Sequence, residues 1–154
     1  MMSLPSAFAL AFFVAVAPAA QAQEFGSKWI ADAHSGCRMW DPTPLPDEII
    51  RWSGRCVGGY GEERGTLEWY SRGVLFETDV ADFVRGKLNG HGNLRFTEGG
   101  EFDGQFRDQK PNGPGTYHTV DGRTYSGDWK DGCFRDGKRR ANFNVAPQDC
   151  NLSS

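Results

Sequence analysis

The sequence has few isoleucine, valine and leucine residues, so it cannot build the large aliphatic core of a compact α/β or helical domain. Its formal net charge of -3 is too small to indicate a nucleic-acid partner. The chain has instead twenty glycines and a 13% share of aromatic residues. This composition favours short strands, many tight turns, and aromatic rings that cover glycine gaps.

Charge is absent from residues 1–22, which read MMSLPSAFALAFFVAVAPAAQA. The apolar run from Ala7 to Ala17 is too short to span a bilayer, and Ala20-Gln21-Ala22 has the small residues that signal peptidase requires. We expect a cleaved signal peptide at 1–22, a mature start at Gln23, and a secreted or periplasmic protein. No Lys or Arg precedes the apolar run, so an uncleaved anchor is the alternative.

Patterns typical of catalysis and metal binding are missing. The chain has no C-x-x-C pair, no G-x-S-x-G elbow and no phosphate-binding loop, and its three histidines share no ligand spacing. Its acidic residues alternate with rings and are expected to face solvent: Glu62, Glu63, Asp103, Asp128 and Asp131. The sequence therefore predicts no enzyme, no metal and no cofactor.

A repeat of about 23 residues dominates the rest of the chain. Units begin near residues 52, 79, 102 and 125, and the first has four extra residues near Ser71 to Val74. The first position of each unit reads Trp52, Asp79, Phe102 and Tyr125; the third reads Gly54, Ala81, Gly104 and Gly127; the fifth reads Cys56, Phe83, Phe106 and Trp129. The fourth copy matches the repeat pattern only through its first strand.

Each unit is predicted to be a β-hairpin. Positions one, three and five of a strand share one face, and the glycine between two rings leaves space for a bulky neighbour. Tight reversals are expected at Asn89-Gly90, Asn112-Gly113 and Asp121-Gly122, which puts His91 at a hairpin tip. Because a lone hairpin is marginal in water, the units must stack. The repeat block is assigned to 52–140.

Cysteines lie at both ends of this block. Three pairings are possible, and the local one, Cys37 with Cys56 and Cys133 with Cys150, is favoured because each pair lies at one end of the repeats. The lead-in 23–51 and the tail 141–154 are then expected to cap the open edges of the sheet.

The units Phe102 to Gly122 and Tyr125 to Gly132 resemble the MORN repeat, whose pattern is aromatic-x-Gly-x-aromatic, a Gly-containing loop, then Gly-x-Gly. The resemblance extends over about Trp52 to Gly137, with departures at Asp79, Ala81, Gln109 and Cys56. It implies an all-β, open, curved antiparallel meander of stacked hairpins. The resemblance also implies a role in interaction or scaffolding, through protein or membrane lipid, without a common chemistry.

Two features are candidate binding surfaces. The first is a ring row, which could hold a peptide or a sugar if exposed on a concave face, or form the stacking core: Trp69, Phe83, Phe102, Phe106, Tyr125 and Trp129, with Trp52 beside them. The second is the basic run Lys138-Arg139-Arg140 with Arg135, which could meet anionic lipid or an acidic protein. The leading hypothesis is a non-catalytic scaffold that contacts an unknown protein; glycan, cell-wall or anionic-lipid binding is the alternative.

Overall fold

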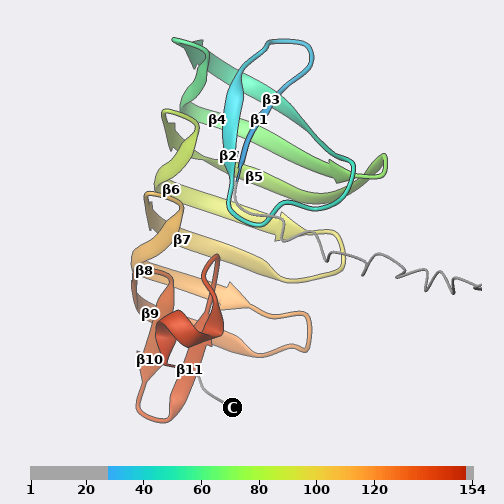
Figure 1. The fold of residues 1–154 in the computed structure, drawn as a ribbon. Helices are drawn as coiled ribbons and strands as arrows, with labels where there is room; N and C mark the ends of the chain where they lie inside the picture. Colours follow the sequence, from blue (N-terminus) through green and yellow to red (C-terminus); the bar gives the residue numbers. More distant parts are fainter. Residues whose placement is uncertain (1–27, 152–154) are drawn as a thin grey trace, which may run out of the picture.

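The computed structural model describes residues 28–151, and they are almost entirely β-structure (Figure 1). The expected signal peptide, 1–22, lies outside the described residues. The strands are β1 (Lys28–Ala31), β2 (Arg38–Asp41), β3 (Glu48–Val57), β4 (Tyr60–Ser71), β5 (Val74–Val84), β6 (Lys87–Phe96), β7 (Glu101–Arg107), β8 (Lys110–His118), β9 (Thr124–Lys130), β10 (Cys133–Asp136) and β11 (Arg139–Asn142), followed by a 3-10 turn, η1 (Pro147–Cys150).

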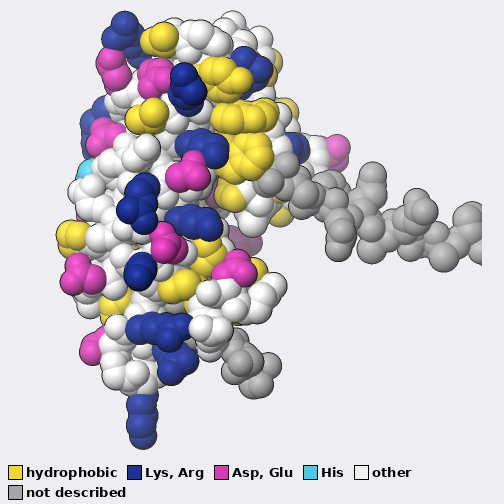
Figure 2. All heavy atoms as spheres, turned by 60° about the vertical axis from the view of Figure 1, so that its left-hand side comes forward, with side chains coloured by type: hydrophobic (Ala, Val, Ile, Leu, Met, Phe, Trp, Pro, Cys, Tyr) yellow, Lys and Arg dark blue, Asp and Glu magenta, His cyan; other side chains and the backbone are white. Residues whose placement is uncertain are grey.

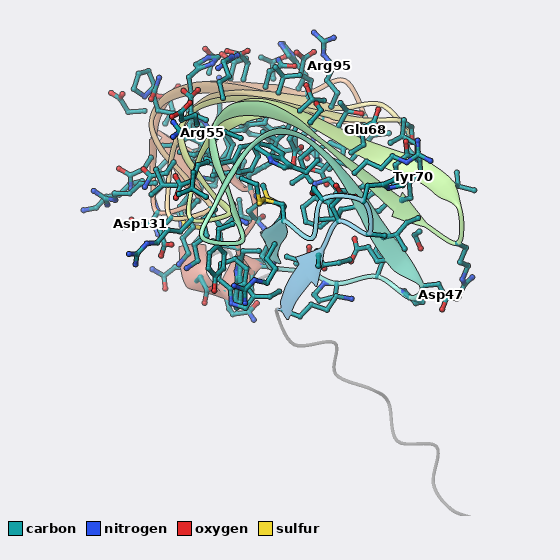
Figure 3. All side chains as sticks on the ribbon, turned by 90° about the horizontal axis from the view of Figure 1, so that it is seen from above. Asp47, Arg55, Glu68, Tyr70, Arg95 and Asp131 are labelled. Carbon is teal, nitrogen blue, oxygen red and sulfur yellow. A yellow bond between two sulfur atoms is a disulfide. The ribbon has the colours of Figure 1, made fainter. Side chains whose placement is uncertain are left out.

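From β3 to β11 every strand pairs antiparallel with the next, as a meander. The sheet is open and strongly curved, and its strands form an arc when seen from above (Figure 3). The predicted all-β meander of stacked hairpins is confirmed. Its first strand begins at Glu48, four residues before the first repeat position at Trp52. Within residues 28–151, no helix has the length and apolar character needed to cross a membrane.

A row of glycine and alanine crosses the sheet. Six residues from consecutive strands β4 to β9 stand directly opposite one another: Gly65, Ala81, Gly92, Gly104, Gly115 and Gly127. Because these positions have no side chain beyond a methyl, they form a shallow channel across the buried face. The aromatic rings lie in this channel.

The ring of Phe102 shows why the channel is needed. A Cβ atom added at Gly104 would stand 3.0 Å from the Phe102 ring, and one added at Gly115 would stand 2.8 Å from it. Trp52 lies in the same way over Gly54 and Gly65. The expected packing of rings over missing side chains therefore occurs, both within a unit and against the next one.

The second unit departs from this pattern in two linked positions. Asp79 stands where the other units have a ring, and Ala81 stands where they have glycine. With no ring at position one, a methyl group two residues later is accommodated, and Ala81 is fully buried. The loss of the ring and the gain of the methyl are one structural change.

Gly104→Ala is expected to lower the free energy of unfolding by about 2 kcal/mol, because the new methyl would meet backbone, Gly115 Cα at 2.5 Å and Pro114 O at 2.8 Å. The matched control is Ala81→Gly, the same position one unit earlier, which should cost about 1 kcal/mol or less. Urea unfolding of both variants checks this. Equal losses would contradict the assignment of ring packing to this channel.

Hairpin turns lie at residues other than those expected. Asn89-Gly90 and Asn112-Gly113 are within β6 and β8, where Gly90 and Gly113 have φ of 125° and 111° beside irregularities in strand register. These glycines serve β-bulges, while the two-residue reversals are Arg85-Gly86 and Asp108-Gln109. The prediction of reversals at both Asn-Gly pairs was wrong. The Asp121-Gly122 turn is present.

His91 consequently lies in β6 and not at a hairpin tip, so that expectation was also wrong. The bulge at Gly90 turns the His91 amide toward Asp82 Oδ2, which accepts its hydrogen bond at 3.0 Å. The imidazole Nε2 lies 3.1 Å from Asp103 Oδ1 on the neighbouring strand β7.

The turns are joined along the stack by a repeated hydrogen bond. The amides of Gly86, Gln109 and Gly132, spaced by the repeat, donate to Gly61 O, Leu88 O and Pro111 O at 2.8, 3.0 and 2.9 Å. Gln109 occupies the turn position that Gly86 and Gly132 occupy in the neighbouring units, and its side chain makes further contacts. Its side chain accepts from Leu88 N at 2.8 Å and donates to Trp40 O at 2.7 Å, so it ties the lead-in to the repeats.

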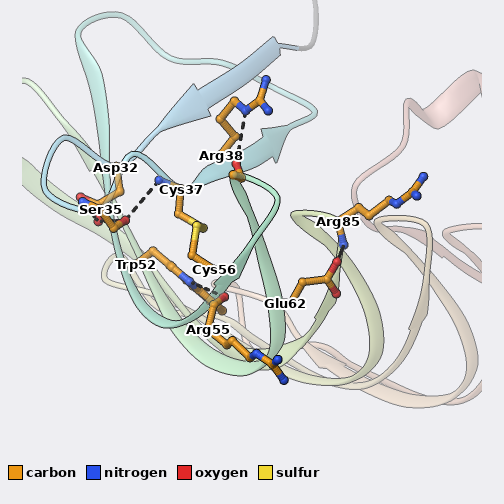
Figure 4. The surroundings of a disulfide bond; sticks show 10 residues. Asp32, Ser35, Cys37, Arg38, Trp52, Arg55, Cys56, Glu62 and Arg85 are labelled. Carbon is orange, nitrogen blue, oxygen red and sulfur yellow. Dashed lines mark hydrogen bonds between the residues drawn. A yellow bond between two sulfur atoms is a disulfide. The ribbon is translucent and has the colours of Figure 1, made fainter.

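Disulfides hold both end segments. Cys37 is bonded to Cys56 and Cys133 to Cys150, which is the local pairing that the sequence favoured. Figure 4 shows the first bond anchoring the lead-in beside Trp52. The β2 amides of Arg38 and Trp40 donate to the turn carbonyls of Gly59 and Gly86. Both end segments are therefore held against the repeats.

Candidate functional site

The predicted ring row is buried. Exposed fractions are 8% or less for all of its members: Trp69, Phe83, Phe102, Phe106, Tyr125, Trp129 and the adjacent Trp52. The rings contact one another edge to face, as Phe102 does with Phe106 and Trp129 at centroid distances of 5.0 and 5.1 Å. The tail adds Phe143, 4.7 Å from Phe102. The row is the core of the molecule.

The basic run is occupied by intramolecular contacts. Arg135 donates to Cys150 O at 2.7 Å, and Arg140 donates to Asn151 O at 3.4 Å. Arg139 donates to Thr124 O and lies over the Tyr125 ring. Arg135 and Arg140 thus hold the tail, and Arg139 contacts β9. Lys138 is the exposed cation of the run without a hydrogen bond or ion pair among residues 28–151.

The acidic residues considered from the sequence lie near or on the surface. Glu63 pairs with Arg55, Asp103 with His91 and Asp131 with Arg107. Glu62 accepts from the Arg85 amide at 3.0 Å, and Asp128 is exposed. Asp128 and Asp131 line one surface pocket together with the cations Lys110, Lys130 and Arg135.

Four other carboxyls converge on a cavity of about 220 Å³ at the concave side. Asp41 comes from the end of β2, Glu48 from the start of β3, and Glu77 and Asp79 from β5. Gln109 and Asn144 also line the cavity. The rest of its wall is aromatic and aliphatic: Leu67, Trp69, Phe76, Phe83, Leu88, Leu94 and Phe96. The cavity therefore combines acidic groups with aromatic walls.

Backbone and indole groups fix these carboxyls. Asp79 Oδ2 accepts from Trp69 Nε1 at 2.8 Å, Asp41 Oδ1 from Thr43 N at 3.0 Å, and Glu48 Oε2 from Leu45 N at 3.1 Å. The other oxygens of the two aspartates, Asp41 Oδ2 and Asp79 Oδ1, are buried and have no hydrogen-bond partner among the described residues.

Glu48 lies beside Asp41, and Glu77 lies beside Asp79, as two pairs of neighbouring carboxyls. Neighbouring carboxyls repel one another when both are ionised. Burial, followed by the Asp41 contact, raises the pKa of Glu48 to about 8. Burial raises the pKa of Asp79 to about 7, and burial next to Asp79 raises that of Glu77 well above its ordinary value. Lys28 Nζ is 3.9 Å from Glu48 Oε2 at the outer side.

Comparison with known families bears directly on the repeat. The MORN repeat model matches residues 81–101 and 102–122, which correspond to β5–β6 and to β7–β8 with the turn that follows. The chain is a MORN-repeat protein. MORN repeats are generally associated with protein or membrane-lipid interactions and are typically non-catalytic. A search of curated proteins found no match to the chain.

The MORN pattern explains why the cavity escaped sequence reasoning. Asp79 and Ala81 are the departures of the second unit from the MORN pattern. The cavity lies where the ring of that unit would be, and its lining is drawn mainly from β5 and its neighbours β4 and β6. An aspartate at a ring position was the available signal. The partners Asp41 and Glu48 come from the lead-in and the first strand, whose approach to β5 no spacing in the sequence reveals.

The convex face of the MORN sheet is polar and ordered from β6 to β9. Asn93 donates to Glu101 and Asp103 on β7, the hydroxyls of Thr116 and Ser126 lie 2.9 Å apart, and His118 contacts Thr124. Figure 3 shows Glu68 and Arg95 on this outer side of the arc. Figure 2 shows basic and acidic side chains interleaved along the hairpin-turn side. No described segment crosses the convex face.

Proposed function

We propose that the protein is a secreted or periplasmic, non-catalytic interaction module that binds a partner protein through the convex face of its MORN sheet. The observation that supports this is the set of side-chain hydrogen bonds between β6 and β7 and between β8 and β9, which hold polar side chains in place before a partner arrives. Pre-ordered side chains lose little entropy on binding.

The size of the face fits this role. Strands β3 to β9 at about 4.8 Å spacing extend about 29 Å, and seven residues of strand add about 23 Å in the other direction. The accessible surface of the side chains over such an area approaches the roughly 800 Å² that one partner contributes to a standard interface. The buried ring row favours this protein contact over stacking on sugars, which needs exposed rings.

The two disulfides indicate an oxidising environment of the extracellular type. Together with the uncharged leader, they support export to a periplasm or to the outside of the cell. The Ala20-Gln21-Ala22 segment is where we propose cleavage.

Reversing two charges on the convex face, Glu101→Lys with Asp103→Lys, is expected to abolish retention of the partner by affinity capture from the compartment that holds the mature protein. Like charges placed opposite a complementary patch disfavour association. Asp121→Lys, in the β8–β9 turn, is the matched control and should retain the partner. Equal retention by both variants, each shown to be folded by circular dichroism, would remove the convex face as the binding surface.

A further inference from the structure

The acidic cavity lies on the side of the sheet opposite the proposed protein interface, and the convex-face proposal does not use it. It exists because one MORN unit has Asp79 in place of a ring. A stacking core needs no carboxyl there, since the other units fill this position with Trp52, Phe102 and Tyr125. The cavity therefore belongs to the repeat unit in which a carboxyl replaces the aromatic ring.

We propose that this cavity binds a compact organic cation, namely the ammonium head group of an alkylamine or of a choline-like ligand. Carboxylates supply the opposite charge, and the aromatic walls supply the faces that attract ammonium groups. Asp41 is 3% exposed and Asp79 is 2% exposed, and each keeps one oxygen that no donor of residues 28–151 reaches. A ligand N–H or a methylated ammonium is the complement of such a site.

A metal ion fits these residues less well. No group of three or more His, Cys, Asp or Glu side chains in the described part of the chain has an arrangement suited to a metal. Much of the lining is Leu67, Trp69, Phe83 and Leu94, which offer hydrocarbon and ring faces where Ca²⁺ requires six to eight oxygen ligands. The apolar and aromatic lining therefore favours an organic cation over a metal ion.

The dimensions agree. An apolar cavity of roughly 150 Å³ holds a benzene molecule. The cavity here, of about 220 Å³, is larger and accommodates an alkylammonium head group of a size comparable to benzene.

The charged groups around the cavity set the pH dependence. Asp41, Glu48, Glu77 and Asp79 face it, and Lys28 is the cation close to Glu48, at its outer side. A cation stabilises the ionised carboxyls, so its binding must release protons from Glu48, Glu77 and Asp79, whose pKa values are raised. Affinity should increase as pH rises from 5.5 to 8.

Isothermal titration of the full mature chain with choline tests the proposal, with 3,3-dimethyl-1-butanol as the uncharged isostere. We expect choline to bind at pH 8, about tenfold more weakly at pH 5.5, and the isostere not to bind. Heats measured in buffers of different ionisation enthalpy should show proton release. Equal binding of the isostere would overturn the proposal, because it would assign the cavity to apolar ligands; binding of Ca²⁺ in place of choline, or of neither, would also overturn it.

Variants locate the site. Asp79→Asn keeps an acceptor for Trp69 Nε1 and removes the charge, and it should weaken choline binding about tenfold. Glu77→Gln should act in the same direction if Asp79→Asn folds poorly. Glu63→Gln, in the surface ion pair with Arg55, is the control and should bind as the unaltered protein does. Unchanged affinity in a folded Asp79→Asn or Glu77→Gln variant would refute the assignment.

Discussion

Trp129→Ala is expected to lower the free energy of unfolding by about 3–5 kcal/mol. The Trp129 side chain is 2% exposed, its ring centroid lies 5.1 Å from Phe102 and 5.4 Å from Phe134, and its Nε1 donates to Gly115 O at 3.2 Å. Truncation removes ring contacts to two units at once and leaves a cavity in a core with few aliphatic side chains to fill it. Urea unfolding followed by circular dichroism measures the loss.

Trp29→Ala is the matched control for this prediction. Trp29 is 40% exposed and lies in the lead-in strand β1, where it contacts Trp40 and Tyr60 at the outer surface. Its truncation should cost about 1 kcal/mol or less, since much of the ring is already in water. A loss below about 1 kcal/mol for Trp129→Ala would mean that the ring row is not the core.

Local regularity made the fold readable from the sequence. A glycine between two rings, repeated in register at Phe102 and Tyr125, dictates a strand face, a partner that fits the gap and a neighbour that covers it. The cysteine positions also sufficed, because each pair brackets one end of the repeats and closes a short loop. These features depend on contacts between residues close in the sequence.

Features that depend on distant contacts could not be read in this way. The bond from Gln109 to Trp40 joins residues 69 apart, and Phe143 reaches the rings of β7 from the tail. The Asn-Gly pairs were misplaced because bulges and reversals both use glycine at positive φ, and only pairing register separates them. The acidic cavity required the lead-in to be placed over β5, which depends on the same long-range contacts.

Raising the pH from 5 to 8.5 is expected to destabilise the ligand-free protein by on the order of 4 kcal/mol. The pKa values of Glu48, about 8, and Asp79, about 7, stand above those of the unfolded chain, as does that of Glu77. Between about pH 4.5 and pH 8 the native state therefore holds protons that the unfolded state has lost. Stability is greatest at the acidic end of this window and falls as pH rises through it, which urea midpoints at several pH values will show.

Glu48→Gln with Glu77→Gln should flatten this dependence and raise stability at pH 8.5, because amides cannot ionise. Glu63→Gln, on a surface ion pair with Arg55, should leave the slope unchanged. Stability that increases between pH 5 and pH 8.5 would contradict the paired, protonated carboxyls. A saturating organic cation should restore the loss at pH 8.5 in the unaltered protein and not in the double variant, since only ionised carboxyls gain from it. The cost of these acids in folding and their affinity for a cation thus have one electrostatic origin, an aspartate in the place of a ring.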